Sequence, residues 1–273
     1  MIRQKGQLYF DDENTSLTVE KINAMLDENF YSDCYPIALK HFLSLTDRIT
    51  NCAPKDLQWL SMEYTVPFFA NLIFRCKNKI FVVLFVKIDE NSRITYPIDV
   101  QLFFSHCSRN NLIPTFLPFT KNHEIINIVD EKWALIDAEA YFNAGVISAV
   151  VPEEVSTDGF VEASDWELYN TAVMAIVEDL CNKQNIDQCL YQTSPGVDPA
   201  VCWIDQKNVF NWMVIRTEKE SEQTRTPDEV LALIKKNNGI GHYGLCKISY
   251  PDGRNVYPRG VPYDLKFEIE DFN

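Results

Sequence analysis

The strongest constraint on the fold of this chain is a weak internal repeat. Residues 80–87 align without a gap to residues 209–216, and both are apolar runs rich in β-branched and aromatic side chains. At the same offset residues 72–74 align to residues 201–203, and a short polar turn follows each. Two β-rich runs joined by a short polar turn predict a β-hairpin, so we expect one hairpin in each half.

The elements flanking the two hairpins also recur in the same order. The apolar spacing predicts helices over 35–45, 98–109, 169–180 and 227–236 and strands over 115–117, 242–246 and 265–269. The last strand alternates apolar and charged residues, so we expect one of its faces to meet solvent. The predicted fold class is α+β: two tandem helix-strand-strand-helix-strand modules, with a mainly antiparallel sheet and helices on one face. A single domain with one continuous sheet is the alternative.

The predicted modules span residues 1–151 and 165–273. An acidic joint is expected at 152–164, because Pro152-Glu153-Glu154 and Thr157-Asp158-Gly159 break the periodic pattern. Gene duplication is a hypothesis at this point, since any two apolar hairpins share some similarity.

Acidic residues outnumber basic residues 39 to 25, which gives a formal net charge of -14. The excess is concentrated from residue 144 onward, where 21 acidic residues face 11 basic ones. This charge argues against nucleic acid and against anionic membrane surfaces as partners. Glu153, Glu154 and Asp158 are candidate contacts for a basic protein partner. The alternative is a solvated stretch kept soluble by its charge, with Ser164 or Asp165 capping the helix that follows.

The eight cysteines indicate a cytoplasmic location. Most of them lie within apolar runs, and no two are spaced as CxxC. This placement favours reduced thiols that act as small core residues over disulfides or a zinc site. No secretory signal is apparent at the N-terminus, and the longest strongly apolar run, 80–86, is too short to span a bilayer.

No catalytic motif is recognisable. His123-Glu124 begins a zinc-protease pattern, but Asn127 occupies the position of the second histidine. The serine-elbow, phosphate-loop and EF-hand patterns are absent from the sequence. We therefore expect no metal and no cofactor, and an enzyme is less expected than a binding protein.

The one alternative set of catalytic residues is Asp198, Asp205 and Lys207. Two acids followed by a lysine are typical of metal-dependent nucleases, in which the acids bind Mg²⁺ and the lysine positions water. However, the Asp205 and Lys207 positions fall in the predicted hairpin turn, and the other half has no acid at the matching place. A surface turn is the favoured interpretation.

The predicted function is therefore that of a non-enzymatic, cytoplasmic protein-binding or regulatory protein. It would act through a groove or sheet edge between the two similar modules. Its candidate partner-binding residues are Glu153, Glu154, Asp158, Phe68 and Phe69, the two phenylalanines lying in an irregular stretch that could line a groove. The alternatives are a metal-dependent hydrolase with scattered carboxylates and a small-ligand binder with an aromatic-lined pocket. The oligomeric state is left open.

Overall fold

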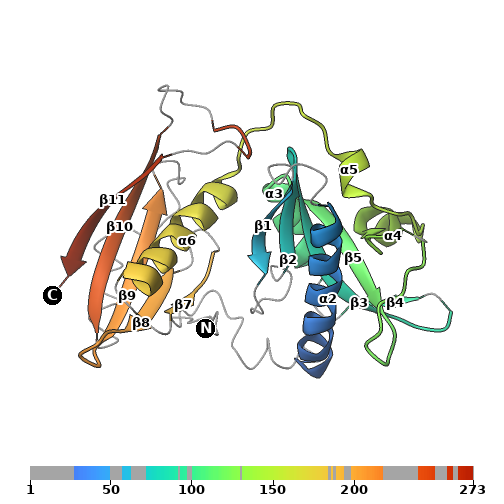
Figure 1. Cartoon of the computed structure of the whole chain (residues 1–273), viewed down its shortest axis with the longest axis horizontal. Helices are drawn as coiled ribbons and strands as arrows, with labels where there is room; N and C mark the ends of the chain where they lie inside the picture. Colours follow the sequence, from blue (N-terminus) through green and yellow to red (C-terminus); the bar gives the residue numbers. More distant parts are fainter. Residues whose placement is uncertain are drawn as a thin grey trace. The chain divides into compact units, whose positions relative to one another are not determined.

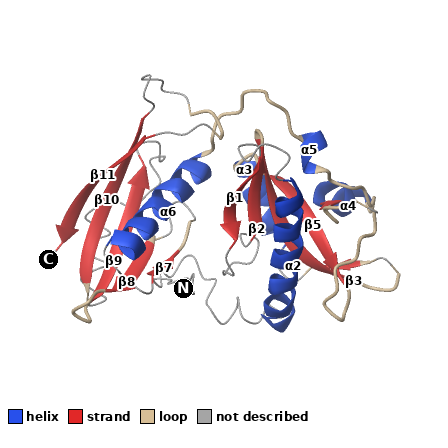
Figure 2. Ribbon diagram, viewed as in Figure 1, coloured by secondary structure: helices blue, strands red, loops and turns tan. Residues whose placement is uncertain are grey.

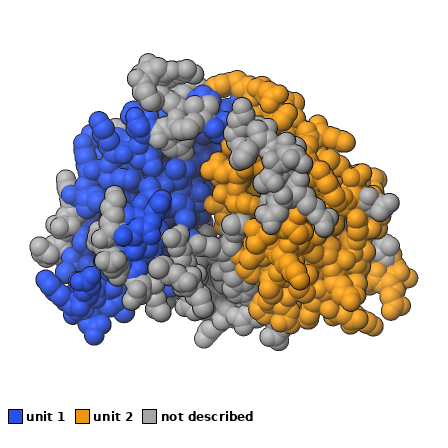
Figure 3. Space-filling view, viewed as in Figure 1, with its two compact units in different colours: residues 1–16, 161–273 blue, residues 17–160 orange. Residues whose placement is uncertain are grey.

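The fold is seen in a computed structural model that forms two compact units (Figures 1 and 3). Unit 2 comprises residues 17–160, and unit 1 comprises residues 161–273 together with residues 1–16. The structure describes residues 28–49, 57–62, 72–91, 93–96, 100–129, 131–183, 186, 189–193, 198–217, 239–249, 257–260 and 264–272. Helices and two mainly antiparallel sheets make up these residues, which is the expected α+β class (Figure 2).

Unit 2 contains a sheet with the order β1-β2-β3-β5-β6, to which β4 adds by pairing with β3. Its strands are β1 (Leu57–Met62), β2 (Leu72–Cys76), β3 (Lys79–Ile88), β4 (Ile94–Thr95), β5 (Ile113–Phe119) and β6 (Ile136–Asp137). All neighbouring strands in this sheet are antiparallel except β3 and β5, which are parallel. The expected hairpin is therefore β2–β3, and the expected strand at 115–117 is part of β5.

The helices of unit 2 lie on both faces of its sheet, which differs from the expectation of one face. These helices are α2 (Glu28–Ile49), α3 (Val100–Arg109), α4 (Ala138–Ala144) and α5 (Pro152–Val155). On β5, Phe119 contacts Phe30 of α2, whereas its near neighbour Phe116 contacts Phe103 of α3 and Tyr141 of α4. Side chains alternate between the two faces along a strand, so positions 116 and 119, three residues apart, face opposite sides. Helix α2 therefore lies on one face of the sheet, and α3 and α4 lie on the other. The reason is the parallel step from β3 to β5, which requires a crossover, and α3 supplies it.

An aromatic cluster forms the centre of unit 2 on the α2 side. The Phe74 ring stacks on Phe81 at 5.1 Å and on Trp133 at 5.2 Å between centroids. Phe42 of α2 packs against both Phe74 and Trp133. All four side chains are fully buried, and burial of large aromatic surface is the main stabilising contribution they make.

Unit 1 contains one long helix and a second sheet, with the order β11-β10-β9-β8-β7. Its elements are α6 (Asp165–Lys183), β7 (Cys189–Tyr191), β8 (Val201–Ile204), β9 (Phe210–Thr217), β10 (Ile240–Ser249) and β11 (Asp264–Phe272). Leu168, Val173 and Val177 of α6 belong to one buried cluster with Met213 and Ile215 of β9. The predicted helix over 227–236 lies outside the described residues.

The two sheets share one topology. Apart from β4, which pairs with β3 and has no described counterpart in unit 1, each sheet follows a helix with three antiparallel strands, then a strand parallel to the third, then a last described strand antiparallel to that one. The strands aligned in the sequence, β2–β3 and β8–β9, occupy equivalent places in their sheets. Descent of the two halves from one ancestor stays a prediction, because shared topology alone does not establish it.

The start of α6 carries a capping box. The Ser164 backbone N–H donates to Glu167 Oε2 at 2.8 Å, and the Glu167 N–H donates to Ser164 Oγ at 3.3 Å. These reciprocal bonds satisfy N–H groups that the first turn of a helix leaves unpaired. Arg259 also holds Glu167 through Nη2 at 2.6 Å and Nε at 2.9 Å. Of the two expected capping residues, Ser164 is the one whose side chain makes this contact.

Candidate functional site

The predicted acidic contacts are tied into unit 2. Glu153, in α5, accepts hydrogen bonds from Lys132 Nζ at 2.7 Å and from Trp133 Nε1 at 2.8 Å. Glu154 is exposed on the same short helix, and Asp158 pairs with Lys77 at 3.4 Å. Two of the three carboxylates are thus balanced by lysines, so the local negative charge is smaller than the sequence implied.

The segment following α5 is fastened by one buried asparagine. Asn78, in the β2–β3 turn, donates from Nδ2 to Thr157 Oγ1 at 2.9 Å and to the Gly159 carbonyl at 2.8 Å. Its Oδ1 accepts the Thr157 backbone N–H at 3.0 Å. Residues 152–160 therefore belong to unit 2, whereas the sequence suggested a joint at 152–164. Phe68 and Phe69, the two aromatic candidates, lie outside the described residues.

The alternative catalytic residues have structural roles. Asp198 is buried and forms a bidentate pair with Arg216, through Oδ1 to Nη1 at 2.9 Å and Oδ2 to Nη2 at 2.7 Å. Asp205 lies in the β8–β9 turn, where its Oδ1 accepts the backbone N–H groups of Lys207 and Val209. The Val209 hydrogen bond is the main reason that the pKa of Asp205 lies below its ordinary value. One acid is occupied by an arginine and the other shapes a turn, an arrangement that supplies no metal site.

In the part of the chain that the structure describes, no cluster of metal-ligand residues is found and the cysteines are buried. No group of three or more His, Cys, Asp or Glu residues there could hold a metal ion. The described cysteines are buried free thiols, and Cys181 Sγ lies 4.0 Å from Cys189 Sγ. Burial raises the pKa of the Cys107 and Cys202 thiols, so neither is a thiolate near neutral pH or a ready nucleophile.

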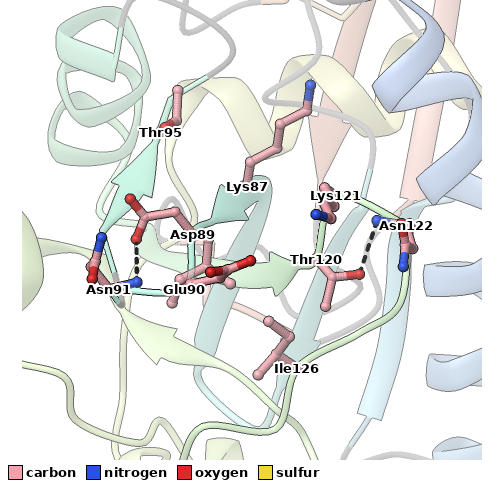
Figure 4. A pocket seen from close by; sticks show the side chains of 10 residues that line it. Lys87, Asp89, Glu90, Asn91, Thr95, Thr120, Lys121, Asn122 and Ile126 are labelled. Atoms are coloured by element: carbon pink, nitrogen blue, oxygen red, sulfur yellow. Dashed lines mark hydrogen bonds between the residues drawn. The ribbon is translucent and has the colours of Figure 1, made fainter.

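One pocket in unit 2 brings polar side chains from two loops together (Figure 4). It lies where the parallel strands β3 and β5 end, and its volume is about 600 Å³. Its lining residues are Lys87, Ile88, Asp89, Glu90, Asn91, Thr95, Thr120, Lys121, Asn122 and Ile126. Asp89, Glu90 and Asn91 come from the turn after β3, and Thr120, Lys121 and Asn122 come from the loop after β5. Figure 4 shows these two groups on opposite sides.

Both loops of this pocket are shaped by side chain to backbone bonds. Asp89 Oδ1 accepts the backbone N–H groups of Asn91 and Arg93, each at 2.8 Å. Thr120 Oγ1 accepts those of Asn122 and Glu124, at 3.1 and 3.2 Å. Such local bonds hold polar turns in one conformation, so the pocket walls are preformed.

A second candidate site is the outer edge of the unit 1 sheet. β11 ends the strand order and pairs only with β10 among the described strands. Asp264, Lys266, Glu268 and Ile269 are exposed along it, whereas Leu265 and Phe267 pack on the core. This alternation agrees with the solvated face that the sequence predicts.

Sequence reasoning missed the pocket, although the chain carries a signal for it. Two apolar runs, 80–88 and 113–119, each end in a polar turn that contains a lysine or a carboxylate. Their juxtaposition depends on the parallel pairing of β3 with β5, and the sequence analysis expected mainly antiparallel pairs. The polar pocket also differs from the aromatic-lined pocket considered for a small-ligand binder.

Comparison with protein-family models, with curated proteins and with solved structures found no match. Among the described residues, no helix combines the length and the apolar composition needed to cross a membrane.

Proposed function

We propose that this chain is a non-enzymatic binding protein that recruits another protein through the edge strand β11 of unit 1. The partner would add an extended segment alongside β11, as in recognition by strand addition. The main observation in support is that β11, at Asp264–Phe272, pairs with β10 and with no other described strand. A strand of this length presents a row of backbone N–H and C=O groups that a partner strand can bind.

An apolar contact beside this edge supports the proposal. Ile269 is 50% exposed on the sheet face that α6 covers elsewhere, because it lies across from Gly244 of β10. A glycine offers no side chain to shield its neighbour, so the Ile269 side chain stays available to a partner residue.

The charge of the chain favours a basic partner. Asp264 and Glu268 are exposed on β11, although Glu268 also pairs with Lys247 of β10. The formal charge of -14 would attract a basic segment from a distance. A cytoplasmic location is part of this proposal and is supported by the free thiols of the described cysteines.

A peptide-binding experiment with a matched control tests this function. The probe is a peptide of alternating lysine and valine, titrated while backbone amide shifts are followed by NMR. We expect the largest shifts in β11 and β10, and we expect Ile269→Lys to weaken binding about tenfold by adding a like charge at the contact. Ile204→Lys is the control, since Ile204 is 55% exposed in the same sheet but on β8.

Either of two results would contradict the proposal. Shifts that map away from β11 would move the interaction to another surface. Equal affinity of the two lysine variants would show that position 269 has no part in binding.

A further inference from the structure

We propose that the unit 2 pocket binds a small zwitterion, a molecule that carries one carboxylate and one ammonium group. This site is separate from the β11 edge, since all of its lining residues belong to unit 2.

The position of the pocket follows from the topology. β3 and β5 are adjacent and parallel, so their carboxyl ends meet at one edge of the sheet. The chain leaves β3 toward β4 and leaves β5 through the 120–126 loop, and the two exits leave a hollow between them. In open, mostly parallel sheets, crevices at the carboxyl ends of the strands are common ligand sites, and the one parallel pair of this sheet forms an edge of the same kind.

Carboxylates line one side of the pocket and Lys121 lines the other. Lys87 of β3 also lines the pocket, but its Nζ lies over the Phe30 ring, 4.7 Å from the ring centroid. Glu90 and Asp89 belong to the β3–β4 turn, and Lys121 belongs to the loop after β5 (Figure 4). Within the described residues no ion pair joins Lys121 to either carboxylate, and Glu90 and Lys121 make no hydrogen bond. Opposite charges that share a pocket without meeting leave room for a ligand that contacts both.

The uncharged lining fits a ligand with a short apolar part. Ile88 and Ile126 supply apolar surface, and the volume of about 600 Å³ lies within the usual range for small-molecule sites. The Thr120 hydroxyl oxygen accepts two backbone N–H groups, so its own proton can be donated to a ligand carboxylate. An apolar amino acid is the simplest molecule with these features.

The first test compares small probes that carry both charged groups or only one of them. L-leucine carries both groups, L-leucinamide carries only the ammonium, and N-acetyl-L-leucine carries only the carboxylate. 4-Aminobutyrate is a second zwitterion that places its charges farther apart. We expect saturable binding of at least one zwitterion by calorimetry, with amide shifts at 89–91 and 120–122, and binding about tenfold weaker or more for the single-charge analogues.

Substitutions then assign the contacts. Glu90→Gln keeps the shape of the side chain and Lys121→Met keeps most of its length, while each removes one charge, and each should weaken zwitterion binding about tenfold or more. Lys207→Met and Glu154→Gln are the controls, because both residues are exposed and lie outside the pocket. The proposal is overturned if no zwitterion binds, if a single-charge analogue binds equally well, or if the controls weaken binding as much as the pocket variants.

Discussion

At the scale of single residues, the pairing of buried charges is the feature that the sequence did not predict. In the sequence Asp198 is a candidate metal ligand, but in the fold its carboxylate pairs with Arg216, which lies 18 residues further along the chain. The side chains of Asp198 and Arg216 are only 1% and 4% exposed. Nothing local in the sequence indicates this pairing, because it depends on the path from residue 198 through β8 to the end of β9.

Removing one member of this pair should be costly. Asp198→Asn removes the carboxylate that forms the bidentate pair with buried Arg216, and we expect the free energy of unfolding of unit 1 to fall by about 3–5 kcal/mol. The Arg216→Met single variant should cost a similar amount. The double variant should cost clearly less than the sum of the singles, as measured by urea unfolding in a double-mutant cycle. Strict additivity would show that the two side chains are not coupled.

His106 of α3 should make stability depend on pH. Burial lowers its pKa to about 4 from an ordinary value of 6.5, so the native state favours the neutral ring. The unfolded chain binds a proton at His106 below pH 6.5, whereas the native chain binds it only near pH 4. The free energy of unfolding is therefore unaffected by His106 above pH 6.5 and falls as the pH is lowered from 6.5 to about 4. The loss should reach about 3 kcal/mol.

The measurement is urea unfolding at pH 7 and at pH 4.5 for the native chain and for His106→Leu. The variant should show a weaker dependence on pH than the native chain over this window, because its position 106 cannot titrate. Parallel losses in the two proteins would remove His106 as the cause.

At the scale of elements, periodicity served well where the segment was long. The helices predicted over 35–45 and 169–180 lie within α2 and α6, and both predicted hairpins are present as β2–β3 and β8–β9. The short strands β6 and β7 and the short helices α4 and α5 were missed, because they contain only one or two periods of the apolar pattern, too few to stand out from chance. β10 spans Ile240–Ser249 and so extends beyond the strand predicted over 242–246.

The capping box of α6 offers a test at this scale. Ser164→Ala removes the side chain that accepts the Glu167 N–H and should lower the free energy of unfolding by about 1 kcal/mol. Glu167→Gln should cost more, because it also removes the charge that faces buried Arg259. Asp165→Asn, at an exposed neighbour, is the control for thermal or urea unfolding. A larger loss for the control than for Ser164→Ala would contradict this assignment.

At the scale of the whole molecule, the order of elements was more predictable than their pairing. The repeat placed equivalent strands in equivalent positions of both sheets, since an apolar hairpin specifies its own antiparallel partner. The parallel pairs β3–β5 and β9–β10 were not anticipated, because a crossover joins strands whose contact no local pattern records. The pocket was therefore not predicted, whereas the solvated face of β11 was.

The net charge makes a prediction for the whole chain. Association of the lysine–valine peptide should be fast at low ionic strength and should slow as salt is added, because salt screens attraction over about 10 Å at 0.1 M. Stopped-flow measurement between low and physiological salt checks this expectation. An association rate independent of salt would show that the charge of -14 has no part in partner capture.

The clasp made by Asn78 has a mechanical consequence. Tension applied to the chain beyond residue 160 enters unit 2 through the segment at 157–159, which Asn78 bonds to the β2–β3 turn. The force would therefore pass to the β2–β3 hairpin before it reached α5. Asn78 thus contributes to the point at which unit 2 resists a pulling force. Asn78→Ala would remove its three hydrogen bonds, so residues 157–159 would detach from the β2–β3 turn at a lower force.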